Sequence, residues 1–375
     1  MFDKEIELSA HIELSDKCNA RCIMCGRNYI DLNNSNELSF KPNLQTGELY
    51  LEDYINIFDN EFYNTFNLTK INFCGNRSDP IITKDFFEII KFCYFKNKNT
   101  NISISTNGSL KPKKWWYNLG KLMSPFSHKV TFGIDGLADT HFIHRPNTDF
   151  NKIISNAESF IKGGGKAVWQ FIIFKNNQHQ IEEAKELAKN IGFIDFFTLF
   201  TPRFAWFKND YVKYKFKNKE YVLEETTLDK ELKTEDLRKK IWMSYRTGDR
   251  SKNEWKPKNE AGTINCSALE KNEFFLDFNG NVFPCCWLGG SLNKLKSPVD
   301  ISPDNIIHMY DEENMNAIDG NLTEILKNSE WFNQLKKHWG VSPCRTCANF
   351  CGSTNTYPSN KKANFKQKRY YNLND

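Results

Sequence analysis

Residues Leu8–Leu14, with the sequence LSAHIEL, stand three residues before Cys18–Cys25, with the sequence CNARCIMC. The first stretch alternates apolar and polar side chains, which predicts a short β-strand. The second carries three cysteines at C-x3-C-x2-C spacing on the loop that leaves this strand, so we expect the thiols of Cys18, Cys22 and Cys25 to converge on one site. Zinc sites usually supply a fourth protein ligand, and none is evident here. A cubane iron–sulfur cluster held by three cysteines would keep one iron open to a substrate or cofactor.

Short strands and longer helical stretches alternate from this point to about residue 200. The predicted strands are Leu8–Leu14, Ile71–Phe73, Ile102–Ser105, Val130–Ile134, Val168–Phe174 and Phe196–Leu199. The predicted helices between them are Leu51–Phe58, Asp85–Phe95, Lys113–Met123, Ile153–Ile161 and Ile181–Asn190. Parallel strands need crossover helices that pack back onto the sheet. The sequence therefore predicts an α/β fold, with a parallel sheet curled into a full or partial barrel and helices outside it.

Glycine and polar residues follow several predicted strands at the point where each strand ends. Gly75–Pro80 follow the second strand, Thr106–Gly108 the third, and Asp135–Gly136 the fourth. Because the carboxyl ends of parallel strands meet at one edge of the sheet, and barrel enzymes bind ligands at that edge, we expect these residues to face the same ligand as the three cysteines.

Composition and charge limit the class of protein. The chain has 375 residues, and 39% of them are hydrophobic, which suffices for one large domain and a smaller one. No apolar run is long enough for a membrane span and the first residues are acidic, so we expect a cytoplasmic protein without a membrane partner. The net charge of +5 is small and scattered, which makes a nucleic-acid partner unlikely on charge grounds.

The cysteines are better read as metal ligands than as a disulfide framework, because cytosolic thiols are kept reduced. The chain has eleven of them. Cys74 and Cys93 lie in apolar segments and are interpreted as structural. Besides the three front cysteines, the remaining six gather towards the end of the chain: Cys266, Cys285, Cys286, Cys344, Cys347 and Cys351.

Four regions are predicted along the chain. Residues 1–210 form the barrel, 211–260 a charged and partly helical connecting segment, 261–355 a small domain with the second cysteine group, and 356–375 a basic tail. Asn279-Gly280 separates two apolar runs in the small domain, which predicts a β-hairpin with a type I′ turn.

Taken in order, these motifs resemble those of the radical S-adenosylmethionine (radical SAM) superfamily. Its signature is the C-x3-C-x2-C spacing after the first strand of a partial (β/α)6 barrel, and the resemblance here extends from about Leu8 to Cys351. Three further segments support it: Gly75–Pro80 (GNRSDP) resembles a Gly-Gly-Glu-Pro segment, Ser105–Gly108 (STNG) a Thr-Asn-Gly turn, and Phe132–Gly136 (FGIDG) a Ser-Ile-Asp-Gly segment.

The resemblance implies a cofactor site for S-adenosylmethionine beside a [4Fe–4S] cluster. Asp79 and nearby backbone carbonyls would bind the methionine ammonium, and the Arg145 fork would bind its carboxylate. Asn177 would lie near the adenosine, whereas Gly133 stands where the superfamily often has a serine that contacts the cofactor. The residues implied to bind the cofactor are Gly75, Asn76, Ser78, Asp79, Asn107, Asp135, Arg145 and Asn177.

The second cysteine group resembles the auxiliary-cluster domains of the same superfamily, called SPASM when they hold two clusters and twitch when they hold one. The block Cys344-x2-Cys347-x3-Cys351 is too short for two clusters, which favours a twitch domain. The ligands of one auxiliary [4Fe–4S] cluster would be Cys266, Cys285, Cys344 and Cys347. Cys286 and Cys351 are alternative ligands, and tetrahedral zinc is the alternative metal.

The resemblance implies an enzyme that reductively cleaves S-adenosylmethionine and removes a hydrogen atom from a substrate, leading to oxidation or rearrangement. An electron donor such as flavodoxin or ferredoxin would reduce it. We favour a small or medium polar substrate. Asp135, Gln170, Arg203 and Trp206 are near predicted strand ends and are candidates to line its pocket. One alternative is modification of a ribosomal peptide or protein with an external recognition partner, since the first strand begins close to Met1. The other is a non-enzymatic metal- or nucleic-acid-binding protein.

Overall fold

The computed structural model describes residues 7–32, 35–41, 44–201, 203–204, 207, 209–228, 263–292, 315–328, 335, 337, 339, 347 and 351–352. The chain forms two compact units whose segments alternate along the sequence. Unit 1 comprises Met1–Lys17, Gln45–Ile104 and Trp255–Phe365, and unit 2 comprises Cys18–Leu44, Ser105–Glu254 and Lys366–Asp375. The predicted domain boundaries near residues 210, 260 and 355 stay predictions, and the basic tail lies outside the described residues.

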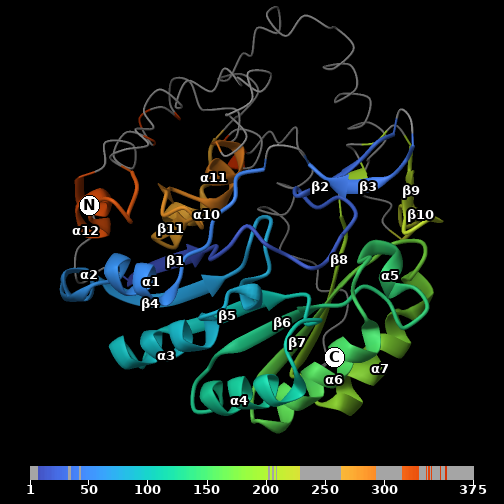
Figure 1. Cartoon of the computed structure of the whole chain (residues 1–375), viewed down its shortest axis with the longest axis horizontal. Helices are drawn as coiled ribbons and strands as arrows, with labels where there is room; N and C mark the ends of the chain where they lie inside the picture. The colour runs from blue at the N-terminus through green and yellow to red at the C-terminus, as the bar shows by residue number, and fades with distance from the viewer. Residues whose placement is uncertain are drawn as a thin grey trace, which may run out of the picture. The chain divides into compact units, whose positions relative to one another are not determined.

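The strands form one sheet with the order β12-β11-β1-β4-β5-β6-β7-β8. Six of them follow in chain order: β1 (Glu7–Ile12), β4 (Asn67–Phe73), β5 (Asn101–Thr106), β6 (Lys129–Gly133), β7 (Lys166–Ile172) and β8 (Asp195–Leu199). The pairs β1–β4, β4–β5, β6–β7 and β7–β8 are parallel. The predicted α/β architecture with six sequential strands is confirmed (Figure 1). Beyond β1, the parallel strand β11 (Glu273–Leu276) and the antiparallel strand β12 (Val282–Phe283) extend the sheet.

The helices of unit 1 bury one face each. Their bounds are α1 (Leu51–Ile57), α2 (Asn60–Thr65), the 3-10 turn η1 (Pro80–Ile82), α3 (Phe86–Lys96), α10 (Ser267–Glu270), α11 (Cys286–Leu292) and α12 (Leu322–Asn328). In α3, Phe86, Ile89, Ile90 and Cys93 are buried at the spacing expected of one helix face. Cys93 packs with its sulfur 3.2 Å from the Tyr54 hydroxyl, in agreement with its predicted structural role.

The helices of unit 2 are α4 (Lys113–Met123), α5 (His141–His144), α6 (Phe150–Lys162), the 3-10 turn η2 (Gln178–Gln180) and α7 (Ile181–Ile191). Of these, α4, α6 and α7 lie along the outer side of β6, β7 and β8, and α5 contacts β10 (Figure 1). Glycines let α4 and α6 approach closely, because a Cβ on Gly120 would lie 2.1 Å from the Phe160 carbonyl oxygen. None of the helices that the structure describes is long and apolar enough to cross a membrane.

Two small hairpins stand outside the main sheet in unit 2. One pairs β2 (Asn28–Ile30) with β3 (Leu38–Phe40), and the other pairs β9 (Tyr211–Phe216) with β10 (Lys219–Glu224). The prediction that the connecting segment is partly helical stays a prediction, and its residues 211–224 form a hairpin. The reason is local: side chains alternate in burial along β9, and Lys217 and Asn218 both have positive φ, as a type I′ turn requires. Residues 229–262 of that segment lie outside the described residues.

The predicted hairpin of the small domain exists as β11 and β12, but its turn is of another type. Gly280 has φ +84°, whereas Asn279 is not among the residues with positive φ, so the turn is not type I′. Asp277 decides the geometry: its Oδ1 accepts the backbone N–H groups of Asn279 and Asn281, each at 2.9 Å. The Gly280 N–H also donates to the Asp277 carbonyl at 3.0 Å, which gives a type I turn followed by a left-handed glycine.

Candidate active site

The loop that carries the three front cysteines is held along its backbone by the segment after α5. The Arg21 N–H donates to the Pro146 carbonyl at 2.8 Å, and the Ile23 N–H donates to the His144 carbonyl at 3.0 Å. The His144 ring returns a contact, with Nε2 at 3.0 Å from the Ile23 carbonyl oxygen. The loop between Cys18 and Cys25 is thus fixed by strand-like pairing with residues 144–146.

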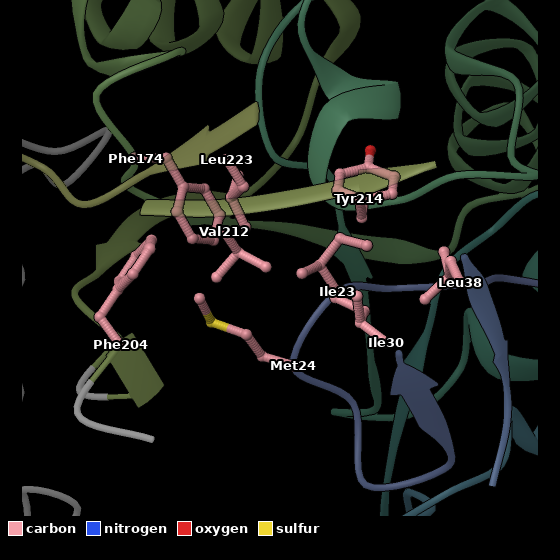
Figure 2. Packing of buried hydrophobic residues seen from close by; sticks show 9 residues of the cluster. All are labelled: Ile23, Met24, Ile30, Leu38, Phe174, Phe204, Val212, Tyr214 and Leu223. Atoms are coloured by element: carbon pink, nitrogen blue, oxygen red, sulfur yellow. The ribbon is translucent and has the colours of Figure 1, made fainter. Parts of the chain in front are cut away.

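The residues between the second and third cysteine anchor the loop in a hydrophobic cluster. Ile23 and Met24 are buried, and Met24 has φ +69°, which turns the backbone sharply between them and Cys25. The Arg203 guanidinium donates to the Met24 carbonyl at 3.0 Å. Figure 2 shows the cluster that surrounds the two side chains, made of Ile30, Leu38, Phe174, Phe204, Val212, Tyr214 and Leu223. The hairpins β2–β3 and β9–β10 therefore support the cysteine loop.

Cys22 lies within electrostatic reach of Cys25 and Arg145, and Cys18 lies within electrostatic reach of Arg145 and Arg21. Burial raises the pKa of Cys22 to about 12, against the opposing charge of Arg145, and the Cys25 thiol raises it further. The charge of the Cys18 thiolate favours the charged form of both guanidinium groups, Arg145 and Arg21. No three His, Cys, Asp or Glu side chains in the described part converge on a single metal ion. Ligands of a cubane each hold a different iron, so they are not expected to converge in that way.

Asp135 bonds both His144, which contacts the cysteine loop, and Arg145. The carboxylate is fully buried, and its Oδ2 accepts from Nδ1 of His144 at 2.7 Å and from Nε of Arg145 at 2.5 Å. Its Oδ1 accepts the Ile172 N–H at 2.7 Å. Burial alone would raise the pKa of Asp135, but the Arg145 charge and the His144 hydrogen bond outweigh it and hold that pKa well below its usual range. Asp135 is therefore a carboxylate at neutral pH.

The histidines next to this network have pKa values below the ordinary value, and burial is the largest cause for both. Burial is the main cause that lowers the pKa of His144, against the pull of Asp135. Burial and the charge of Arg145 lower the pKa of His141 to about 3, and its Nδ1 accepts the Asp135 N–H at 3.1 Å. The sequence analysis missed His144, although its place directly before Arg145 was a usable signal.

Gly133 gives Arg145 the space that it occupies. A Cβ at position 133 would lie 2.6 Å from Nη2 of Arg145. The resemblance leads one to expect a serine at this position. Glycine fits instead, because even a Cβ at position 133 would collide with the Arg145 guanidinium.

Two predicted cofactor residues of unit 2 have defined local roles. Nδ2 of Asn107 lies 3.7 Å from the Cys18 sulfur and donates to Oδ1 of Asn19 at 3.0 Å, which places Asn107 beside the cysteine loop. Asn177 is 2% exposed and closes the turn after β7, because its amide bonds the Phe174 N–H at 2.7 Å and the Ile172 carbonyl at 3.0 Å. Both side-chain heteroatoms of Asn177 are thus engaged in shaping the backbone.

In unit 1 the predicted segment Gly75–Pro80 forms a tight turn after β4. Oε1 of Glu13 accepts the N–H groups of Arg77 at 2.8 Å and Ser78 at 3.1 Å. Oδ1 of Asp79 accepts the Ile81 N–H at 3.3 Å, so that carboxylate caps η1. Burial raises the pKa of Glu13 to about 7. Glu13 was not predicted from the sequence, because it is one of the polar residues of the alternating stretch Leu8–Leu14 and nothing there distinguishes it.

A second set of thiols lines one pocket of unit 1. Its lining includes Cys266, Cys285, Cys347 and Cys351. Cys266 and Cys351 are brought together by the backbone, because the N–H of Asn265, the residue before Cys266, donates to the Cys351 carbonyl at 2.8 Å. A hydrogen bond from the Cys351 thiol lowers the pKa of Cys266 to about 6. Apolar and aromatic neighbours complete the lining: Leu269, Pro284, Trp287, Leu288 and Leu335.

The two other cysteines of this group, Cys344 and Cys286, do not line the pocket in the described structure. Cys344 lies outside the described residues. Cys286 is not part of the lining; it begins α11, and its carbonyl accepts Nδ2 of Asn76 at 2.9 Å. Burial raises the pKa of Cys286 well above its ordinary value, and the ten described cysteines form no disulfide.

Comparison with solved structures identifies the fold. The chain matches the Streptococcus suis protein SuiB at 14% identity and a TM-score of 0.52, over 88% of this chain and 68% of SuiB. With SuiB bound to S-adenosylmethionine the identity is 14% and the TM-score 0.52, over 92% of this chain and 72% of that one. The chain matches anSMEcpe with bound AdoMet at 17% identity and a TM-score of 0.51, over 96% of this chain and 93% of anSMEcpe.

The chain therefore shares the fold of these proteins, an α/β fold with the partial barrel that the sequence motifs predicted. No protein-family profile matches the chain.

The Asp135 network leads to a prediction about stability. Asp135→Asn removes the charge that faces the buried Arg145, and breaking a buried ion pair in this way costs about 3–5 kcal/mol. We expect the thermal midpoint to fall by roughly 6–20 °C. Because the pKa of Asp135 is depressed, its stabilisation is fully present above about pH 4, so the deficit should be the same at pH 6 and pH 8.

Differential scanning calorimetry of metal-free protein checks this prediction. The matched control is Asp210→Asn, which alters an exposed carboxylate and should change the midpoint by little. A deficit no larger than that of the control would contradict the role given to Asp135.

Proposed function

We propose that this chain is a radical SAM enzyme whose front cysteines, Cys18, Cys22 and Cys25, hold a [4Fe–4S] cluster. The observation that carries the proposal is the cysteine loop itself: three thiols on a loop clamped by residues 144–146, beside the guanidinium of Arg145. Three thiolates and no fourth protein ligand suit a cluster with an open iron. The positive charges of Arg145 and Arg21 near Cys18 suit the net negative charge of such a cluster.

The chain's own residues would divide the binding of S-adenosylmethionine between them. Asp135 holds Arg145 through Nε, which leaves the two terminal nitrogens of the guanidinium for a carboxylate. Asn107 lies beside Cys18, and Asn177 shapes the turn after β7 near the expected adenosine. Gly75, Asn76, Ser78 and Asp79 would supply the turn that binds the methionine ammonium. When bound, the cluster and the cofactor together supply a one-electron cleavage that leads to hydrogen-atom abstraction from the substrate.

We further propose an auxiliary [4Fe–4S] cluster in the cysteine-lined pocket of unit 1, as in a twitch domain. Cys266, Cys285, Cys347 and Cys351 fit a four-thiolate site, because all four line one pocket that apolar side chains shield from water. Cys344 remains a candidate from the sequence. Cys351 gains support over Cys286, since Cys351 lines the pocket and Cys286 does not.

The substrate proposed first is a small or medium polar molecule that is oxidised or rearranged, with a flavodoxin or ferredoxin as reductant. The setting proposed is cytoplasmic. Solved structures of similar proteins favour a second candidate, radical modification of a peptide: one is SuiB bound to precursor peptide SuiA, and another is anSMEcpe with bound AdoMet and Kp18Cys peptide. A peptide substrate would be brought to the enzyme by an external recognition partner.

Cofactor cleavage tests the proposed function. Anaerobic, reconstituted and chemically reduced wild-type protein should convert S-adenosylmethionine to 5′-deoxyadenosine and methionine, measured by liquid chromatography with mass spectrometry. Cys22→Ala should reduce this conversion to background, because the loop would lose one of three iron ligands. Cys93→Ala, in α3 and outside both thiol groups, should retain it. Wild-type protein that holds its iron yet leaves the cofactor intact would overturn the proposal.

An iron and sulfide count tests the auxiliary site. The wild-type chain should bind about eight irons, and Cys351→Ser should bind about four, because an incomplete thiolate set would not retain the auxiliary cluster. Cys286→Ser is the matched control and should keep about eight. Equal loss in both variants would contradict the selection of Cys351, and about four irons with one zinc in wild type would remove the auxiliary cluster.

A further inference from the structure

Two arginines share one aromatic ring beside the cysteine loop of unit 2. Cζ of Arg21 lies 3.1 Å from the ring centroid of Phe40, and Cζ of Arg27 lies 4.5 Å from the same centroid. The two guanidinium groups lie within electrostatic reach of each other and repel. Because arginine keeps its charge at every physiological pH, this repulsion is permanent, and a negative charge nearby would offset it.

The hairpin β2–β3 holds this ring and Arg27 against the cysteine loop. The Asn28 N–H donates to the Cys25 carbonyl at 3.0 Å, and Nδ2 of Asn28 donates to the Cys22 carbonyl at 2.9 Å. Asn28 is the register partner of Phe40 in the hairpin and follows Arg27 directly in the chain. The ring on which the Arg21 guanidinium rests is therefore fixed relative to two of the three front cysteines.

Arg21 itself stands inside the cysteine motif, between Cys18 and Cys22. Its side chain is half-buried, and its Nη1 is buried without a hydrogen bond. In the part of the chain that the structure describes, no carboxylate forms an ion pair with Arg21, and the negative group that acts on it is the Cys18 thiolate. Its positive charge is thus directed at the cysteine loop and is only partly screened by water and salt.

Arg145, the other guanidinium within electrostatic reach of Cys18, differs from Arg21 in one respect. Asp135 forms a buried ion pair with Arg145, which cancels much of its charge. Arg21 therefore supplies a positive charge to the loop that no carboxylate opposes.

We propose that Arg21, held on the Phe40 ring, raises the reduction potential of the front cluster. The inference rests on the proposed function and concerns residues of unit 2 alone. On reduction the cluster takes one electron from the flavodoxin- or ferredoxin-type donor, with no ligand gained or lost, and its net charge becomes more negative by one. A fixed positive charge stabilises the more negative state, so the donor reduces the cluster more readily.

A redox titration followed by electron paramagnetic resonance tests the proposal on the full-length, reconstituted protein. The signal to follow is the one that Cys22→Ala lacks, so that an auxiliary cluster does not interfere. Arg21→Met should lower the equilibrium constant for reduction of this cluster by about tenfold, which for one electron is about 59 mV.

Lys189→Met is the matched control, because it removes an exposed cation from the last turn of α7. It should leave the equilibrium constant for reduction unchanged, since an exposed charge remote from the cluster is screened. A change in Arg21→Met no larger than the change in Lys189→Met overturns the proposal.

The conservative variant Arg21→Lys separates the effect of charge from a structural role. Lysine keeps the positive charge, so the equilibrium constant should lie closer to that of wild type than to that of Arg21→Met. Equal values in Arg21→Lys and Arg21→Met would mean that the side chain acts by shaping the loop, and would overturn the proposal.

An iron count keeps the remaining outcomes apart. Arg21→Met should retain as much iron as wild type. Should it lose the front cluster, Arg21→Gln is the second neutral variant, with the same expected fall in the equilibrium constant. Loss of the cluster in both would make Arg21 a residue for cluster retention and would overturn the proposal.

Failure of the proposed function gives a different result. If Cys22→Ala binds as much iron as wild type and keeps every signal, then the front cysteines hold no cluster, and the proposed function fails with this inference. If the front cluster is present but its potential is the same in wild type and Arg21→Met, only this inference fails.

Discussion

The fully buried carboxylate of Asp135 is the group on which the candidate active site of unit 2 depends. One of its oxygens accepts from both His144 and Arg145, and the other holds the backbone at Ile172. Through His144 the same network reaches the Ile23 carbonyl inside the cysteine loop. One negative charge thus orients the guanidinium and steadies the loop, and the low pKa of Asp135 keeps that charge in place across the physiological pH range.

Two further residues of unit 2, Gly133 and Met24, give the guanidinium and the cysteine loop their positions. Gly133 leaves room for the guanidinium, and the positive φ of Met24 lets the loop send two apolar side chains into the cluster between the hairpins. The cysteine loop therefore has apolar anchoring on one side and backbone pairing on the other. Such a loop can present three thiols without first having to become ordered, which lowers the cost of binding a cluster.

The elements that the sequence predicted well are those with a clear period. The helical spacing in α3 was predicted correctly because burial of one helix face dominates it. The strand β1 was also predicted correctly, although both of its faces are buried. The turn at Asn279-Gly280 was predicted with the wrong type, since the deciding group is the Asp277 carboxylate rather than the local propensity of Asn-Gly. The front cysteines and Arg145 could be found from spacing and resemblance. Glu13 and His144 were missed, because the Glu13–Arg77 and His144–Ile23 contacts join residues more than sixty positions apart, although the place of His144 before Arg145 was a usable signal.

The two thiol groups lie in different units, Cys18, Cys22 and Cys25 in unit 2 and the pocket cysteines in unit 1. The central claim concerns the first group, and electron paramagnetic resonance tests it most directly, on anaerobic, chemically reduced protein before and after addition of S-adenosylmethionine. The account predicts an iron–sulfur signal in wild type whose g-values shift when the cofactor is added, and no such shift in Cys22→Ala. A wild-type spectrum that saturating cofactor leaves unchanged, or a shift that persists in Cys22→Ala, would contradict it.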